Sequence, residues 1–266
     1  MIVRNFKGQK VADMIRQHGY RRVLLRLHHG LGDAVMFYSR IFRKLKQEFP
    51  RVEFYLDTHC GQEELFGDPD RNEAAYDVVF EIGMPCCEWD SRRDTKVERC
   101  AFEEIGITPG PEDYTMPRRW SSPLVGMHFF STCSRELCCP EQLARDIWEM
   151  TIEAGMIPID THMKHGFAEP KNIPWTWESS RIFDAPATMR KLFGVIGSCA
   201  GFAGVVSGNL WAALSTLPPD KILVICTDFS VKRLTRLPVH ELNVRDAKRL
   251  DVVECWLRAV TKGIKP

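Results

Sequence analysis

Two glycines and an aspartate, Gly30, Gly32 and Asp33, stand where a short apolar run gives way to a helical pattern. Glycine lets another molecule come close to the main chain, and the start of a helix presents amide groups that carry partial positive charge. This joint can therefore hold an anion or a polar ligand. A carboxylate here has two candidate roles, capping the helix or accepting a proton as a general base, and the spacing alone leaves both open.

The elements on either side of Asp33 follow from the spacing of apolar residues. A short apolar run of strand length is formed by Val23, Leu24, Leu25 and Leu27. From Val35 to Phe49 apolar side chains recur at helical spacing, which places the basic residues on other faces of the helix: Arg40, Arg43, Lys44 and Lys46. The unit is a strand, a glycine loop and a helix. A dinucleotide fingerprint is not indicated, because the third glycine of that motif is absent.

The same alternation continues along the chain. In the first half, residues 1–19 predict a short amphipathic helix, and residues 52–58 and 76–83 predict two more strands. Residues 108–123 are rich in proline and turn formers and predict an interdomain linker. In the second half the pattern predicts strands at 124–129, 156–162, 202–206 and 221–226, and helices at 141–154, 187–198, 207–215 and 246–260.

This order of elements indicates the fold class. Strands that alternate with helices form mainly parallel sheets with right-handed crossovers. Because the chain of 266 residues is long enough for two cores, we expect an α/β fold with two doubly wound domains, residues 1–120 and 121–266. In such sheets ligands bind beyond the carboxyl ends of the strands, so the cleft between the domains is the expected active site.

Composition narrows the classes of protein to which this chain can belong. Hydrophobic content of 44% and charged content of 27% are those of a globular protein, and the net charge of +1 gives no general attraction to DNA or anionic membranes. No apolar run reaches the length of a membrane span, and the N-terminus lacks the apolar core of a signal peptide. We therefore expect a cytoplasmic protein.

The ten cysteines fit that compartment. They lie in apolar contexts or as adjacent pairs, which is typical of reduced thiols rather than of a disulfide framework. A zinc site stays open as an alternative, although no Cys-x-x-Cys motif is present. Its ligands would come from Cys86, Cys87, Cys100, Cys138 and Cys139.

Three segments carry a family resemblance. They are VLLRLHHGLGDAVMFYSRIFRKLKQEFPRVEFYLDT, then VGMHFFSTCSRELCCPEQLARDIWEM, and last FAGVVSGNLWAALSTLPPDKILVIC. Taken in this order, they resemble glycosyltransferase family nine, the ADP-heptose:lipopolysaccharide heptosyltransferases. The resemblance implies the GT-B fold, in which two Rossmann-like domains face a central cleft. It also implies a nucleoside diphosphate sugar as donor, a saccharide or other hydroxyl group as acceptor, and transfer with inversion at the sugar carbon.

The resemblance assigns roles to individual residues. Asp33 becomes the general base, in an acceptor loop formed by His29, Gly30, Leu31 and Gly32. The donor-binding residues become Ser131, Thr132, Ser134, Arg135, Ser207, Gly208 and Asn209. No metal and no other cofactor is expected, because Arg135 and the amide groups of the helix opened by Ser207 and Gly208 can stabilise the departing diphosphate.

Two positions depart from the family pattern and keep alternatives open. Val206 stands where the family has an acidic residue, and Trp211 stands where it has a histidine, so two polar contacts to the donor are absent. One alternative is a viral-type enzyme that glycosylates DNA bases, for which a basic groove would be required. Its candidate residues are Arg40, Arg43, Lys44, Arg92, Arg93, Arg118 and Arg119. The other is a catalytically degenerate relative that binds a nucleotide or a protein partner.

Overall fold

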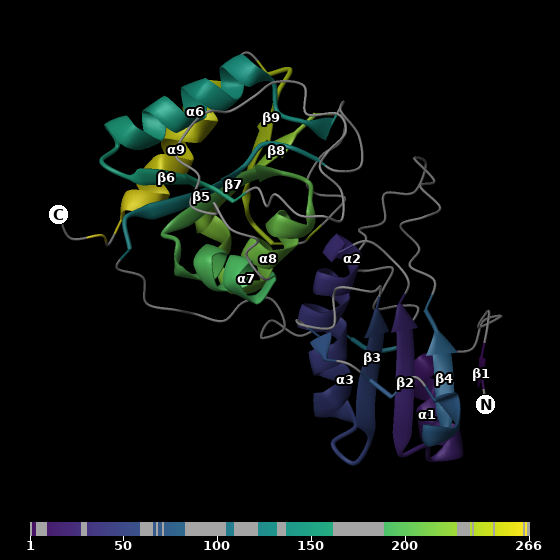
Figure 1. Cartoon of the computed structure of the whole chain (residues 1–266). Helices are drawn as coiled ribbons and strands as arrows, with labels where there is room; N and C mark the ends of the chain where they lie inside the picture. The colour runs from purple at the N-terminus through teal and green to yellow at the C-terminus, as the bar shows by residue number, and fades with distance from the viewer. Residues whose placement is uncertain are drawn as a thin grey trace. The chain divides into compact units, whose positions relative to one another are not determined.

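The computed structural model divides the chain into two compact units, drawn in Figure 1. Unit 1 is Met1–Tyr114 with Lys232–Arg236, and unit 2 is Thr115–Val231 with Leu237–Pro266. The boundary expected between residues 120 and 121 lies outside the described residues. These are 2–3, 10–27, 31–58, 66–67, 69–70, 72–82, 105–108, 122–131, 137–161, 189–227, 235, 237–246, 248–262 and 264.

Unit 1 contains a parallel sheet of four strands in the order β1-β4-β2-β3. The strands β2 (Arg22–Leu27), β3 (Glu53–Thr58) and β4 (Val78–Glu81) confirm the three predicted ones. The prediction for residues 1–19 was wrong in part. Ile2–Val3 forms the short strand β1, which pairs with β4, and only Val11–His18 forms the helix α1. A β-branched pair beside a buried strand favours extended backbone over a first helical turn.

One face of this sheet carries the helices. Arg16 of α1 forms an ion pair with Glu48 and lies over the ring of Phe49, at the end of the helix that follows β2. The two helical segments therefore lie side by side on the same face. Val23, Leu25 and Leu27 are fully buried, as expected for the side chains of β2 that point toward these helices.

The helix after β2 is not a uniform α-helix. Its parts are α2 (Leu31–Met36), a π-helical turn η1 (Phe37–Phe42) and α3 (Arg43–Glu48). A π-helical turn holds one residue more between its hydrogen-bonded partners than an α-helix, so it changes which side chains face the core. Arg40 is accordingly buried, with 1% of its surface exposed. The sequence placed Arg40 on an outer face, and that prediction was wrong because it assumed 3.6 residues per turn throughout.

Unit 2 contains a second parallel sheet, with strand order β6-β5-β7-β8-β9. The strands β5 (Leu124–His128), β6 (Ile157–Asp160), β7 (Gly201–Val205) and β8 (Ile222–Cys226) confirm the predictions. The fifth, β9 (His240–Asn243), was not predicted. Its sequence, HELN, has a single apolar residue and gives no alternating signal, but Leu242 is fully buried against the sheet.

Helices cover both faces of this sheet. Figure 1 shows α6 (Glu141–Glu153) and α9 (Arg249–Thr261) on one face, with α7 (Met189–Ser198) and α8 (Gly208–Thr216) on the other. All four predicted helices are confirmed, with small shifts at their ends. A 3₁₀ turn, η6 (Pro219–Lys221), leads into β8.

The helix α9 packs closely against the sheet in the core of unit 2. Trp256 is fully buried, and its indole Nε1 donates a hydrogen bond to the Lys221 carbonyl oxygen at 3.0 Å. The Lys221 ammonium in turn donates to the Ala259 carbonyl near the end of α9. A methyl group on Gly201 would lie 2.5 Å from Val260 Cγ2, so glycine is required for this close approach.

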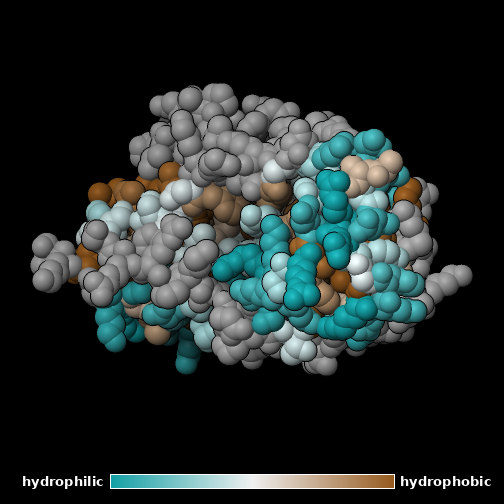
Figure 2. Space-filling view, turned by 90° about the horizontal axis from the view of Figure 1, so that it is seen from below, coloured by the Kyte–Doolittle hydropathy of each residue, from teal (hydrophilic) through white to brown (hydrophobic). Residues whose placement is uncertain are grey.

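On the face drawn in Figure 2, apolar patches alternate with hydrophilic side chains. Among the residues described, the large apolar side chains that are exposed are Ile2, Ile152, Ile157 and Leu250. Within the same ranges, no helix combines the length and apolar character needed to cross a bilayer.

Candidate active site at the carboxyl ends of the strands

Asp33 lies just beyond the carboxyl end of β2, in the first turn of α2. Because the helix begins at Leu31, Asp33 is its third residue and not its N-cap, which corrects the capping prediction. A carboxylate in this turn is still stabilised by the unpaired amide groups and the helix dipole. The side chain is partly exposed. Gly32 lies in the same turn, while His29 and Gly30 lie outside the described residues.

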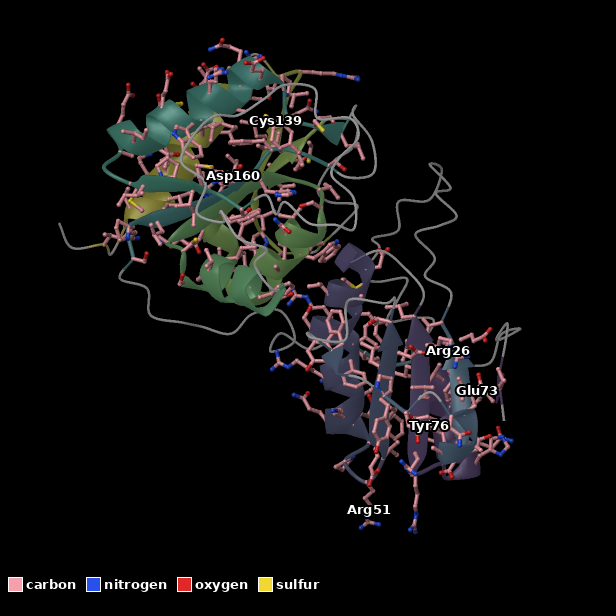
Figure 3. All side chains as sticks on the ribbon, viewed as in Figure 1. Arg26, Arg51, Glu73, Tyr76, Cys139 and Asp160 are labelled. Carbon is pink, nitrogen blue, oxygen red and sulfur yellow. The ribbon has the colours of Figure 1, made fainter. Side chains whose placement is uncertain are left out.

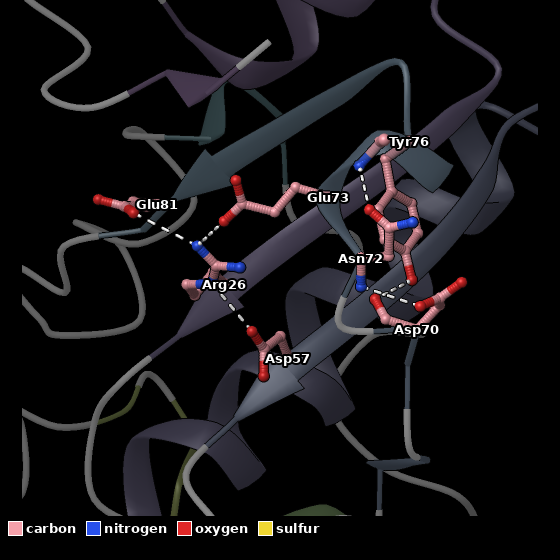
Figure 4. A network of polar contacts seen from close by, with 8 residues as sticks. Arg26, Asp57, Asp70, Asn72, Glu73, Tyr76 and Glu81 are labelled. Atoms are coloured by element: carbon pink, nitrogen blue, oxygen red, sulfur yellow. Dashed lines mark hydrogen bonds and ion pairs between the residues drawn. The ribbon is translucent and has the colours of Figure 1, made fainter.

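A charged cluster lies across the ends of three strands in unit 1. Figure 3 labels Arg26 and Glu73 near one end of the sheet, and Figure 4 shows the contacts in detail. Arg26 Nε donates to Asp57 Oδ2 at 2.9 Å, and Nη1 donates to Glu73 Oε1 at 2.8 Å and to Glu81 Oε1 at 3.5 Å. Arg26 pairs in register with Asp57 of β3 and with Glu81 of β4. One cation thus faces three carboxylates.

This cluster fixes the end of the strand that leads to Asp33. Desolvation lowers the pKa of Arg26, but the hydrogen bonds and charges of Asp57 and Glu73 outweigh it and raise the pKa overall. The guanidinium therefore stays charged. Glu73 belongs to the turn η2 (Glu73–Ala75), which Asn72 caps through its side chain. Beside it, the Tyr76 hydroxyl donates to the Asp70 carbonyl at 2.9 Å.

Replacing Arg26 by methionine should destabilise unit 1. The variant keeps the length of the side chain but leaves three partly buried carboxylates without their cation, and we expect a loss of about 1 to 2 kcal/mol. Urea unfolding measures it. Arg22→Met is the matched control, because Arg22 lies on the same strand, is 47% exposed and is 3.7 Å from its partner Glu53. Equal losses in the two variants would show that the cluster has no special role.

The predicted donor residues of unit 2 lie on two strand ends. Ser207 caps α8, and its Oγ accepts a hydrogen bond from the Leu210 amide at 3.3 Å. Gly208 and Asn209 are the first two residues of that helix. Ser131, three residues beyond β5, is buried, and its amide lies 3.3 Å from Cys138 Sγ. The remaining predicted donor residues lie outside the described residues: Thr132, Ser134 and Arg135.

Two residues that the sequence did not single out meet Asn209 at this edge. The Asn209 amide nitrogen Nδ2 lies 2.9 Å from His128 Nδ1 and donates to the Thr161 carbonyl oxygen at 2.9 Å. His128 is the last residue of β5, and Thr161 follows Asp160, the last residue of β6, which Figure 3 labels. Both residues fall near the ends of the predicted strands 124–129 and 156–162, and polar residues at such places are too common to single them out.

Comparison with solved structures identifies the fold. The iron-containing dodecameric glycosyltransferase TibC from enterotoxigenic E. coli H10407 has a TM-score of 0.61 at 14% identity, over 91% of this chain and 78% of that one. The E. coli ADP-heptose lps heptosyltransferase II has a TM-score of 0.55 at 12% identity, over 90% and 98%. The chain has the GT-B fold of the heptosyltransferases.

A third neighbour supports the same fold. The glycosyl transferase family 9 protein from Veillonella parvula has a TM-score of 0.56 at 10% identity, over 93% of this chain and 90% of that one. No family model and no curated protein sequence matches the chain. The likeness to these structures is therefore one of fold, at sequence identities of 10 to 14%.

The two residues that depart from the family pattern, Trp211 and Val206, both lie at least partly buried in this heptosyltransferase-like fold. Trp211 has 5% of its surface exposed and forms part of the buried side of α8. Val206 lies directly between β7 and Ser207 and is partly buried. An indole in the core packs against apolar neighbours, whereas the family's histidine is polar. The polar or flexible residues at this end of α8 are therefore Ser207, Gly208 and Asn209.

Of the cysteines within the described residues, Cys138, Cys139, Cys199 and Cys226 are buried thiols, whereas Cys255 is exposed. Burial raises the pKa of Cys199 to about 12 and raises the pKa of Cys139 as well. Such thiols stay protonated at neutral pH, whereas zinc is bound by thiolates. Among the residues that the structure describes, no group of three or more metal-ligating side chains gathers. Cys86, Cys87 and Cys100 of the alternative zinc site lie outside them.

Proposed function

We propose that this protein is an inverting glycosyltransferase that moves a sugar from a nucleoside diphosphate sugar to an acceptor hydroxyl group. The observation that carries the proposal is the place of Asp33, in the first turn of the helix that follows β2. Ligands of such sheets bind at this edge. The neighbours in fold support the class of reaction, since they include a heptosyltransferase in complex with ADP-D-beta-D-heptose and another with ADP.

In this reaction Asp33 acts as general base. Its carboxylate, in the first turn of α2, accepts the proton of the acceptor hydroxyl. The acceptor oxygen forms a bond to the anomeric carbon from the face opposite the diphosphate, and the bond from that carbon to the diphosphate oxygen breaks. The configuration of the sugar is therefore inverted. The acceptor lies against His29 and Gly30 and the first two residues of α2, Leu31 and Gly32.

The second sheet holds the donor in this proposal. Negative charge grows on the diphosphate as it leaves, and amide groups at a helix start stabilise it. Ser207 and Gly208 begin α8 at the carboxyl end of β7 and supply such groups. The loop after β5 adds the hydroxyl groups of Ser131, Thr132 and Ser134 and the guanidinium of Arg135. Because these groups supply positive charge, the proposed reaction requires no metal ion.

Titration calorimetry tests the proposal directly. The protein is titrated with ADP, GDP, UDP and their sugar conjugates, with and without a chelator. We expect at least one nucleoside diphosphate to bind, unaffected by the chelator, and its sugar conjugate to be turned over with a saccharide acceptor. The absence of binding at millimolar concentrations would overturn the proposal. Binding without turnover over a broad set of acceptors would identify the catalytically degenerate relative instead.

The DNA-glycosylating alternative is not favoured by any described contact. Its basic groove requires Arg40, which is buried in η1. The net charge of +1 gives no further attraction to a duplex. A cytoplasmic location stays a prediction.

A further inference from the structure

A buried polar network joins three elements at the carboxyl edge of the second sheet. It consists of His128 at the end of β5, Thr161 just after β6, and Asn209 in the first turn of α8. Their exposed fractions are 5%, 0% and 7%. The Thr161 hydroxyl also donates to the Met127 carbonyl oxygen at 2.8 Å, which ties the end of β6 to β5. Buried polar groups of this kind are costly unless they are paired, and these are paired with one another.

The hydrogen bonds of Asn209 fix the orientation of its amide group. A carbonyl oxygen can only accept, so the atom 2.9 Å from the Thr161 carbonyl must be the amide nitrogen. The same nitrogen lies 2.9 Å from His128 Nδ1, and it has only hydrogens to offer. His128 Nδ1 must therefore accept, and the ring carries its hydrogen on Nε2. The two hydrogens of one amide nitrogen thus determine the tautomer of a histidine on another element.

The packing around the network leaves little room for other positions of His128 and Thr161. A methyl group on Gly204 of β7 would lie 2.9 Å from the His128 carbonyl oxygen. A methyl group on Gly126 of β5 would lie 3.3 Å from Thr161 Cγ2. Both strands beside the network therefore carry glycine where a larger residue would move His128 or Thr161. The place of the network is fixed by the backbone as well as by its hydrogen bonds.

We propose that Asn209 is a positioning residue for donor binding, which acts by locking the first turn of α8 and the His128 ring against the ends of β5 and β6. This inference rests on the proposed donor site, because the network holds the residues beneath that site in place. Amide groups bind an anion well only when their directions are fixed before the anion arrives. The network fixes the turn that follows the Ser207 cap, and it does so from within the protein rather than through the ligand.

The test compares Asn209→Leu with the wild type by two measurements. Nuclear magnetic resonance of the histidine ring nitrogens reports the tautomer of His128 without any nucleotide. We expect the wild type to show an unprotonated Nδ1, and the variant to show Nδ1 partly protonated. Calorimetry with the nucleoside diphosphate that binds the wild type should show affinity reduced about tenfold, with the donor KM raised more than kcat is lowered.

Two further variants keep the test decisive. His128→Asn places an amide oxygen near the position of Nδ1, so it can still accept from Asn209, and it should retain most of the affinity. Thr151→Val removes a different fully buried hydrogen bond of unit 2, from Thr151 Oγ1 to the Ile147 carbonyl at 2.7 Å, and controls for general destabilisation. An unchanged His128 tautomer in Asn209→Leu, or an affinity no lower than that of Thr151→Val, would overturn the proposal. If the wild type binds no nucleotide, the proposed function fails, while the tautomer measurement still reports on the network.

Discussion

Asp33→Asn should reduce sugar transfer by roughly two to four orders of magnitude while the protein stays folded. Asparagine has the size of aspartate and can still accept hydrogen bonds from the first turn of α2, but it cannot take a proton from the acceptor hydroxyl. The loss of charge near the helix start should cost only about 0.5 kcal/mol. Turnover of the donor in the presence of acceptor measures the first effect, and thermal unfolding measures the second.

Two variants separate chemistry from stability at this position. Asp13 lies in the first turn of α1, in the same unit, so Asp13→Asn makes the same chemical change at a second helix start and should leave transfer unchanged. Asp33→Ala removes the side chain and should lower both transfer and the melting temperature. Near-native turnover in Asp33→Asn would mean that another residue is the base, and the role of Asp33 would then be limited to the helix start.

Trp256→Ala should strongly destabilise unit 2. The indole is fully buried between α9 and the sheet, and removing it leaves a cavity and an unpaired Lys221 carbonyl oxygen. Truncation of such a side chain costs about 3 to 5 kcal/mol. Because a domain is stable by only about 5 to 15 kcal/mol, such a loss is a large share of the stability of unit 2. Urea unfolding followed by circular dichroism measures the change.

A graded series gives the contributions of packing and hydrogen bonding. Trp256→Phe fills part of the cavity but removes the Nε1 donor. Its free energy of unfolding should therefore lie between those of the wild type and Trp256→Ala. Ile152→Ala is the surface control, since Ile152 lies on α6 with 54% of its surface exposed and should change stability by less than about 0.5 kcal/mol. A loss in Trp256→Ala as small as that of Ile152→Ala would contradict the packing described for α9.

Much of the fold could be predicted from the sequence because its strands are apolar and its helices are periodic. Strands such as β5 and β8 are buried on both faces and read as continuous apolar runs. The errors have physical causes. The short strand β9 has one buried residue, and Ile2–Val3 is too short to show a strand pattern of its own and is stabilised by pairing with β4. Tertiary contacts decided both elements, and no local signal reports such contacts.

The candidate site was predictable to a smaller extent. The glycines before Asp33 marked the joint between strand and helix, and the structure places Asp33 in that joint. The partners of Asn209 were not predictable, because His128 and Thr161 are separated from it by 81 and 48 residues and meet only through the order of the strands. The Arg26 cluster likewise depends on the register of three strands, which the sequence alone leaves undetermined.

The π-helical turn η1 sets the angle between Asp33 and the anchored end of its own helix. This turn contains one residue more than the α-helical turn that it replaces, so deletion of one residue within Phe37–Phe42 would let it close into an ordinary α-helix with little change in the direction of Asp33. Each residue of an ordinary α-helix corresponds to about 100° of rotation and about 1.5 Å of rise. With Leu45 still held in the core, loss of a second residue would therefore turn the carboxylate of Asp33 by about that angle around the helix axis. Deletion of one residue within residues 37–42 should retain much of the transfer, whereas deletion of two should abolish it even where every side chain of the site is retained.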